Sequence, residues 1–188
     1  IRKDLAFLES KGKCKKIYGG AILNRLNVHL EDANSRKNVN SKEKQKIAQM
    51  AYDLIEPNMT VFLDISTTNI ELAKLLVLRP ISGITVVTNM LDVIQILSTS
   101  QIHSIFIGGE FDYARNGFVG NMCDEFLQRF HFDLSFLGVV GIDLESGSVM
   151  TYMPNDGQTK RIVLKQSKKA YMLADSDKFY QMGNYEYA

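Results

Sequence analysis

From residue 42 onward, the apolar positions alternate between two kinds of spacing. Short runs rich in β-branched and aromatic residues indicate buried strands at 60–64, 84–88, 104–107, 134–140 and 170–174. Apolar residues three and four positions apart predict helices at 42–55, 69–76, 91–97, 122–129 and 159–165. Strands that alternate with helices are typical of a sheet covered on both faces. We therefore predict an α/β fold with a mostly parallel sheet flanked by helices. Ser41 is expected to cap the first of these helices and Pro57 to end it.

The first 41 residues follow a different pattern. Apolar residues recur at i, i+4 and i+7 from Ile1, and Gly12 follows, which predicts the last helix of a small domain whose earlier part precedes the chain. The basic stretch 13–20 ends in a glycine pair and predicts either a two-stranded wing or an ordinary loop. Residues 22–40 are polar and weakly periodic, as in a linker with one helical piece.

Charge divides the chain in a similar place. The 188 residues contain 22 Lys and Arg against 21 Asp and Glu, and a net charge of +1 on its own argues against a nucleic-acid partner. Residues 1–46, however, hold 12 basic and 5 acidic side chains, a balance of +7, and the remainder holds 10 and 16, a balance of −6. Such asymmetry favours two functions in one chain, with a merely solvated basic surface as the alternative.

Several classes of protein are excluded by what the sequence lacks. With 45% hydrophobic and 23% charged residues the chain has a globular composition, and it contains neither an apolar run of about 18 residues nor a signal pattern. Two cysteines make no disulfide framework, and the three histidines have no metal-ligand spacing. A P-loop, a GxGxxG loop and a nucleophile–histidine pattern are also missing. We expect a cytoplasmic protein without metal, cofactor or membrane partner.

Polar residues and glycines follow the predicted strands, and ligands bind beyond the carboxyl ends of strands in an open parallel sheet. After the first strand, Asp64 is followed by Ser66, Thr67 and Thr68, which suit either a phosphate cradle at a helix N-terminus or plain N-capping. Later positions of this kind are Thr88, Asn89, Gly108, Gly109, Gly138, Gly141, Asp143 and Lys178. Lys160 is expected near a helix start, where a cation is unfavourable to the helix dipole, so that it is either functional or a surface lysine. Together these positions predict one ligand site.

These motifs resemble those of the DeoR-type bacterial transcriptional regulators. The similarity runs in order through 1–12 and 17–21, then through FLDISTT at 62–68, VVTN at 86–89, IGG at 107–109, FVG at 118–120, FLGVVGID at 136–143, Lys160-Arg161 and LADSDK at 173–178. The sequence departs from the family pattern at Lys3, where a second arginine is usual, and at Ser66, where glycine is common. Asp156 stands where a glutamate is frequent, and Asp112 stands where a basic residue is frequent.

The resemblance implies a division into a remnant of a winged helix-turn-helix (1–21), a linker (22–41) and an effector-binding domain (42–188). The effector domain is expected to share the fold of ribose-5-phosphate isomerase and the CoA-transferases. By the resemblance, Arg2 and Lys3 of the recognition helix and Lys13, Lys15 and Lys16 of the wing contact operator DNA. A phosphorylated sugar is expected at Ser66–Thr68, and the other strand-end residues named above, with Asp64 and Lys160, line its site.

The function that follows is a repressor-type regulator of carbohydrate metabolism that is not an enzyme. It is expected to act as a homodimer or homotetramer, and to be associated with the nucleoid when it is bound to operator DNA. One alternative is a sugar-phosphate isomerase, although the segment 140–143 keeps only one acid where the related isomerase has two. Another is an oligomerisation domain without a ligand. Because the DNA-binding unit is incomplete in these 188 residues, we expect them to bind effector but not operator DNA.

Overall fold

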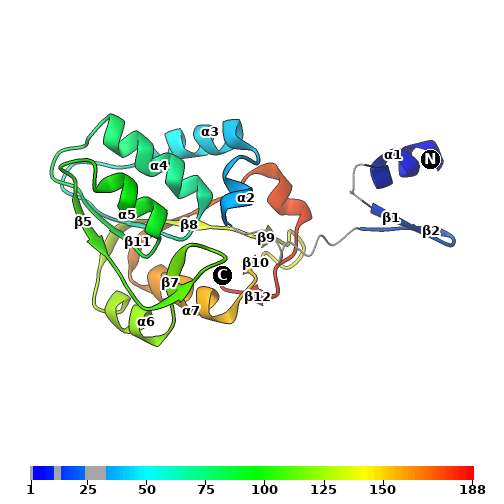
Figure 1. Ribbon diagram of the computed structural model, residues 1–188. Coiled ribbons are helices and arrows are strands. Elements are labelled where there is room, and N and C mark those ends of the chain that lie inside the picture. Colours follow the sequence, from blue (N-terminus) through cyan, green and yellow to red (C-terminus); the bar gives the residue numbers. More distant parts are fainter. Residues whose placement is uncertain (1, 11–13, 24–32) are drawn as a thin grey trace.

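The computed structural model describes residues 2–10, 14–23 and 33–188 (Figure 1). Its N-terminal part consists of helix α1 (Arg2–Ser10) and the antiparallel hairpin of β1 (Cys14–Ile17) and β2 (Gly20–Leu23). The buried Cys14 thiol lies 3.7 Å from the Leu5 carbonyl oxygen, which ties the hairpin to the helix. The stretch 13–20 was expected to form either a two-stranded wing or an ordinary loop, and its described residues belong to a two-stranded hairpin. Ile1, Gly12 and Lys13 lie outside the described residues.

The larger part is built on a five-stranded parallel sheet, which confirms the predicted fold class. Its strands, in spatial order, are β11 (Ser167–Leu173), β8 (Phe132–Gly138), β3 (Thr60–Leu63), β4 (Thr85–Thr88) and β5 (His103–Phe106). Every neighbouring pair in this sheet is parallel. All five carboxyl ends consequently lie along one edge of the sheet.

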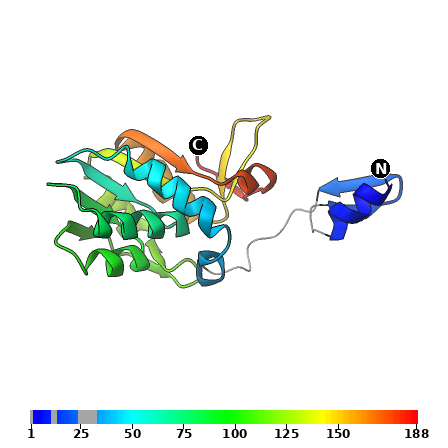
Figure 2. The ribbon, with the colours of Figure 1, turned by 90° about the horizontal axis from the view of Figure 1, so that it is seen from above.

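Helices cover both faces of the sheet (Figures 1 and 2). Helices α3 (Ser41–Tyr52), α4 (Thr67–Leu78) and α5 (Leu91–Leu97) lie on one face, and α6 (Asn121–Leu127) and α7 (Pro154–Lys165) lie on the other. Successive residues of β3 alternate between the two cores: Val61 and Leu63 pack beneath the first group of helices, whereas Phe62 packs beneath the second. This alternation explains why three successive residues of the strand, 61–63, are all apolar.

Several short elements were not predicted from the sequence. They are the hairpin of β6 (Glu110–Asp112) and β7 (Gly117–Val119), the 3-10 helix η2 (Ser176–Tyr180), and a small antiparallel sheet of β9 (Gly141–Ile142), β10 (Val149–Thr151) and β12 (Tyr185–Glu186), whereas the equally short α2 (Ala33–Lys37) lies within residues 22–40, where one helical piece was expected. Each is two to five residues long, too short for a periodic pattern to form. They surround the carboxyl edge of the large sheet or connect its elements.

Three predicted helix boundaries were wrong. Ser41 is the first residue of α3, and the cap is Asn40 in a left-handed conformation with φ of 52° and no side-chain cap bond. The same helix ends at Tyr52, well before Pro57: the N–H groups of Leu54 and Ile55 donate three residues back, to Ala51 and Tyr52, in a tighter turn that follows the helix. Helix α7 begins at Pro154, whose fixed φ and missing N–H suit a first helical position. Lys160 therefore lies in mid-helix and not near a helix start.

None of the helices within the described ranges is long and apolar enough to cross a membrane. In the same residues, no three His, Cys, Asp or Glu side chains come together as metal ligands would. Cys14 and Cys123 are both buried and unpaired as thiols.

Asn69, which is fully buried on α4, holds two strands of the sheet together. Its side-chain amide donates to the carbonyl oxygens of Asp64 and Phe136, each at 2.9 Å. We expect Asn69→Ala to lower the free energy of unfolding by about 1–3 kcal/mol, because a buried carbonyl loses its donor. Urea denaturation measures this change. The exposed Lys74→Ala on the same helix serves as the control and should stay within about 0.5 kcal/mol of wild type; equal effects of the two substitutions would contradict the assignment.

Candidate anion-binding site

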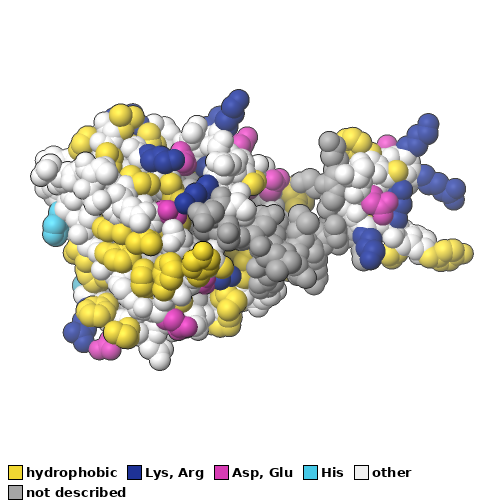
Figure 3. Space-filling view, viewed as in Figure 1, with side chains coloured by type: hydrophobic (Ala, Val, Ile, Leu, Met, Phe, Trp, Pro, Cys, Tyr) yellow, Lys and Arg dark blue, Asp and Glu magenta, His cyan; other side chains and the backbone are white. Residues whose placement is uncertain are grey.

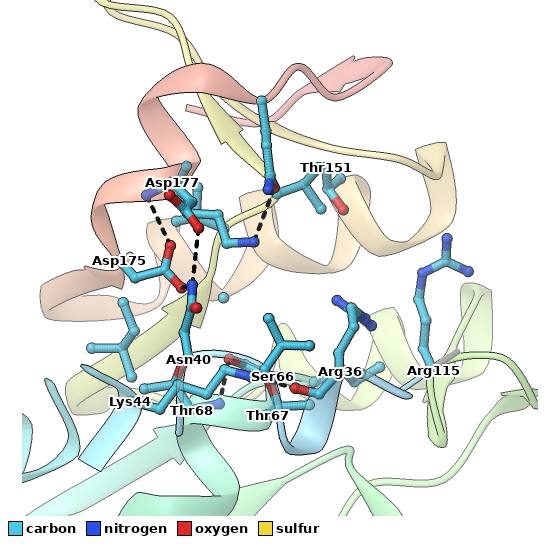
Figure 4. A pocket seen from close by; sticks show the side chains of 18 of the residues that line it. Arg36, Asn40, Lys44, Ser66, Thr67, Thr68, Arg115, Thr151, Asp175 and Asp177 are labelled. Carbon is cyan, nitrogen blue, oxygen red and sulfur yellow. Dashed lines mark hydrogen bonds between the residues drawn. The ribbon is translucent and has the colours of Figure 1, made fainter. Parts of the chain in front are cut away.

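A cavity of about 320 Å³ opens at the carboxyl edge of the sheet (Figure 4). The turn between β3 and α4, the ends of β8 and β11, η2, α7 and the α2–α3 segment all contribute to its walls. The polar and charged residues that line it are Arg36, Asn40, Lys44, Ser66, Thr67, Thr68, Arg115, Thr151, Tyr152, Asp156, Lys160, Asp175, Asp177, Lys178 and Gln181. This volume is at the lower end of the range for small-molecule sites.

The turn into α4 lies at the bottom of the cavity. Ser66 is extended and caps the helix, since its hydroxyl oxygen accepts from the Thr68 backbone N–H at 3.2 Å. N-capping, one of the two interpretations of this motif, is thus present. The positive end of a twelve-residue helix nevertheless faces the cavity, together with the side chains of Thr67 and Thr68. A side chain at Gly138 would bring its Cβ to 2.7 Å from Ser66 Cβ, so glycine allows β8 to approach this turn.

Behind the turn is a buried charge cluster. Asp64 is 1% exposed, and one of its carboxylate oxygens accepts from the Gly138 N–H at 2.9 Å and from the Lys160 ammonium. Asp156 lies 3.4 Å from the same ammonium and accepts from the Thr151 hydroxyl. Burial disfavours the charged form of Lys160, but Asp156 and Asp64 more than offset that effect and raise the lysine pKa. Lys160 is therefore a protonated cation held between two carboxylates.

Other cations line the cavity itself. Lys44 is only 7% exposed and donates to the Arg36 carbonyl oxygen. Burial, together with the positive charges of Lys178 and Arg36, lowers the pKa of Lys44 to about 8. Lys178 donates to Gln181 at 3.0 Å, and Arg115 forms an ion pair with Asp112 at 2.6 Å.

Acids and an amide occupy another part of the wall. The Asn40 amide donates to Asp175 at 3.2 Å and to Asp177 at 3.1 Å. Figure 4 shows these three side chains on one side of the open centre and Arg36 and Arg115 on the other. The cavity thus combines cations, a helix N-terminus and carboxylates, which suits a ligand with both an anionic group and hydroxyl groups.

Comparison with known proteins identifies the family. Residues 39–188 match the DeoR C-terminal sensor domain, and residues 1–26 match the DeoR-like helix-turn-helix domain. This chain belongs to the DeoR family. The resemblance drawn from the sequence motifs is therefore confirmed.

Curated relatives of this DeoR-family chain are transcriptional regulators by name. It is 33% identical over 185 residues to the putative aga operon transcriptional repressor of Escherichia coli O157:H7, covering 95% of this chain and 66% of that protein. It is 33% identical over 188 residues to the HTH-type transcriptional repressor GlcR of Bacillus subtilis, covering 100% and 71%. The 188 residues thus span about two thirds to seven tenths of the length of these relatives.

Solved structures confirm the predicted kinship of fold. Ribose 5-phosphate isomerase from Methanocaldococcus jannaschii superposes with a TM-score of 0.55 at 15% identity, over 74% of this chain and 55% of that one. The δ subunit of eIF2B from Chaetomium thermophilum gives 0.56 at 12% identity, over 81% and 58%. At such identities the likeness concerns the fold alone.

The DeoR-family motifs contribute six of the thirteen predicted effector-site residues to the cavity lining. These are Ser66, Thr67, Thr68, Gly138, Lys160 and Lys178. Asp64 lies directly behind the lining, bonded to Lys160 and Gly138.

Thr88 and Asn89 are not among the residues that line the cavity. The Thr88 hydroxyl donates to the Leu63 carbonyl at 2.7 Å and accepts from the Met90 N–H, so it joins β3 to the start of α5. The Asn89 amide donates to the Phe118 carbonyl at 2.8 Å and thereby holds the β6–β7 hairpin. Both side chains are fully buried in these structural roles.

The remaining predicted positions also lie away from the lining. A Cβ at Gly109 would lie 2.7 Å from the Val119 carbonyl oxygen, and one at Gly141 would lie 2.1 Å from the Gln181 carbonyl oxygen, so close backbone packing explains both glycines. Space is open around Gly108. Asp143 accepts from the Glu145 N–H at 3.0 Å in the turn between β9 and β10, and this bond lowers its carboxyl pKa.

The predicted DNA-contacting residues within the described ranges are exposed on the helix and hairpin. Arg2 and Lys3 lie on α1, and Lys15 and Lys16 lie on β1; the fifth, Lys13, is outside the described residues. Lys16 also pairs with Glu9 at 3.4 Å, and its backbone N–H donates to the same carboxylate.

Sequence reasoning missed several residues that line the cavity. Arg36, Asn40 and Lys44 were assigned to a linker or to an ordinary helix, and no local motif marks them. Arg115 was also missed, although a signal existed: it follows by three residues Asp112, where the family commonly has a basic side chain. The i, i+4 pair of Asp156 and Lys160 was noted only as a departure from the family pattern.

The buried cluster generates a prediction with a defined pH dependence. Lys160→Met should lower the free energy of unfolding at pH 7 by about 3–5 kcal/mol, because it leaves buried carboxylates uncompensated. Burial raises the pKa of Asp64 above its ordinary value, and Lys160 opposes that rise, so the pKa rises further once the lysine is removed. The loss should therefore shrink as the pH falls from 7 toward 4, where both states are protonated. Urea midpoints at each pH measure it.

The double variant Asp64→Asn/Lys160→Met tests whether the pairing is responsible. It should lose less stability than Lys160→Met alone, since one unpaired charge is removed. If Lys160→Met alone is as stable as wild type at pH 7, the charge cluster does not stabilise the fold.

Proposed function

We propose that this DeoR-family protein is a DNA-binding transcriptional regulator of carbohydrate metabolism, of the repressor type, and that its sensor domain binds a phosphorylated sugar in the described cavity. Curated relatives support the first part: besides those above, they include an L-fucose operon activator of Haemophilus influenzae and a lactose phosphotransferase system repressor of Staphylococcus epidermidis. On this proposal the protein works in the bacterial cytoplasm and at the nucleoid.

The observation that carries the effector class is the combination of groups in one cavity. The α4 N-terminus with Thr67 and Thr68 suits a phosphate, because the dipole of this twelve-residue helix favours an anion and the two threonine side chains line the cavity there. Arg36 and Lys44 supply positive charge beside it. Carboxylate and amide side chains on the opposite wall suit sugar hydroxyls, and these are Asn40, Asp175 and Asp177.

We propose a binding site and not an isomerase site. Aldose–ketose conversion requires an acid or base poised at the substrate carbons. The single acid retained in the segment 140–143, Asp143, lies in a hairpin turn and is not a lining residue, while Lys160 is held by two buried carboxylates. We expect no aldose–ketose conversion by the purified chain with any sugar phosphate that it binds, measured by coupled assay; turnover would contradict this part of the proposal.

The N-terminal part supports the DNA-binding role. Arg2 and Lys3 on α1 suit contacts in the major groove, and Lys15 and Lys16 on the hairpin suit phosphate contacts. Figure 3 shows basic side chains projecting from this part. Each neutralised phosphate contributes about 0.9 to the salt slope, so operator binding by the full-length protein should weaken steeply with salt.

The proposal includes self-association as a homodimer or homotetramer. Strand β5 is an outer strand of the large sheet, and Figure 3 shows hydrophobic side chains gathered on the face where β5, β7 and α5 lie. Phe111, on β6, contacts Phe118 with ring centroids 5.0 Å apart and is 42% exposed, and Phe126 on α6 is 55% exposed. An exposed apolar area next to a sheet edge suits contact with a second copy.

A thermal-shift panel tests the effector class. Phosphorylated sugars should raise the midpoint of unfolding, whereas the same sugars without phosphate should not, because a bound ligand stabilises by RT ln(1 + [L]/Kd). Thr67→Val removes one hydroxyl from the cradle at nearly constant volume and should abolish most of the shift. Thr99→Val, at an exposed hydroxyl outside the cavity, should keep it. A shift that survives Thr67→Val would place the phosphate elsewhere.

A further inference from the structure

Part of the cavity wall comes from the segment that joins the N-terminal part to the sheet. Residues 33–44 comprise α2 and the first turn of α3, and they lie in the chain between the β1–β2 hairpin and the first strand of the sheet. Four of them line the cavity: Arg36, Val39, Asn40 and Lys44. We call residues 33–44 the connector. Figure 4 shows Arg36 and Lys44 beside the Ser66–Thr68 turn.

Polar contacts attach the connector to the rest of the domain. The Lys37 ammonium lies 2.9 Å from Asp92 on α5, and the Lys44 ammonium donates to the Arg36 carbonyl oxygen. The Asn40 amide donates to two carboxylates beside it in the cavity wall, those of Asp175 and Asp177. A five-residue helix such as α2 is not stable by itself in water. Its position therefore depends on contacts such as these.

The charges of the connector suit an anion at this place. Lys44 and Arg36 belong to the connector and Lys178 faces them from η2; their mutual repulsion contributes to the lowered pKa of Lys44, with burial as the larger cause. The nearby acids Asp175 and Glu71 oppose that effect only in part. A dianionic phosphate would relieve the repulsion, and a guanidinium binds phosphate oxygens in a fork.

We propose that the phosphate of the effector bridges the Ser66–Thr68 turn of the sensor domain and the Arg36–Lys44 pair of the connector, so that effector binding fixes the connector. This inference rests on the proposed function and adds the route by which an occupied cavity affects the DNA-binding part. The ligand class is a phosphate monoester of a sugar. Effector and operator are then coupled only to the extent that the ligand prefers one connector position.

The first experiment measures affinity. The probes are inorganic phosphate and a set of pentose and hexose monophosphates, titrated by calorimetry into wild type, Arg36→Ala, Lys44→Met and Lys42→Met. We expect Arg36→Ala and Lys44→Met to weaken binding of the best probe about 10- to 100-fold. Lys42 is exposed on α3 and is not a lining residue, so Lys42→Met controls for the loss of one positive charge and should stay within about threefold. Arg36→Lys keeps the charge without the fork and should give an intermediate loss.

The pH dependence gives a second measure. An anion beside Lys44 favours the protonated form, so wild-type affinity should fall as the pH rises from 7 to 9, through the lysine pKa of about 8. Lys44→Met should remove most of this fall. The other groups facing Lys44 are Arg36, Lys178, Asp175 and Glu71, none of which is altered in that variant.

Hydrogen exchange tests whether the ligand fixes the connector. With saturating probe, backbone amides of α2 and of the first turn of α4 should both gain protection in wild type. In Arg36→Ala at saturating probe, the α4 amides should still gain protection, but the α2 amides should not. Equal far-UV circular dichroism spectra and urea midpoints establish that each variant is folded.

The outcomes separate this inference from the proposed function. If no probe binds wild type, the proposed function fails, and the bridging phosphate fails with it. If probes bind wild type, and Arg36→Ala and Lys44→Met bind them equally well, the sensor function stands and the bridge is overturned. The bridge is also overturned if α2 gains the same protection in Arg36→Ala as in wild type.

Discussion

The buried pair of Asp64 and Lys160 is the interaction on which the arrangement of the site depends. It joins the end of β3 to the middle of α7, and through the Gly138 N–H it also includes the end of β8. Removing two charges from water is costly unless hydrogen bonds and a close partner offset it. Here Asp156, which itself accepts from Thr151, adds a second carboxylate near the ammonium. These contacts connect the ends of β3 and β8 with the middle of α7 where the cavity forms.

The same contacts affect which cations are available to a ligand. Lys160 lines the cavity, but its ammonium is already held by two acids, so a ligand phosphate would compete with them. Lys44, by contrast, donates to a neutral carbonyl, and the positive charges of Lys178 and Arg36 affect it more than the acids Asp175 and Glu71 do. The charge cluster thus has a structural role, and on our proposal the connector residues Arg36 and Lys44 bind the anion.

The sequence predicted the large sheet well, because its buried strands are runs of apolar, β-branched and aromatic residues, and the helices between them are long enough to show their period. It predicted the site only in part. Residues directly beyond β3, such as Thr67, reach the cavity, whereas Asn89 binds the β6–β7 hairpin, which has no periodic pattern. The connector was missed because its place is set by contacts distant in sequence: Asn40 reaches Asp175 across 135 positions, and no local pattern records such a pairing.

Net charge gives a misleading picture of the partners of such a protein. Residues 47–188 carry a balance of −6, yet the proposed ligand is an anion. Long-range attraction from the whole domain cannot then hold it, since exposed charges more than a Debye length away are screened. The binding energy has to come from groups within hydrogen-bond distance in the cavity, where the effective dielectric constant is lower than in water and each electrostatic interaction is stronger. Two of those groups, Arg36 and Lys44, belong to the basic N-terminal 46 residues and not to the acidic remainder. The site is therefore built from both the basic and the acidic part of the sequence.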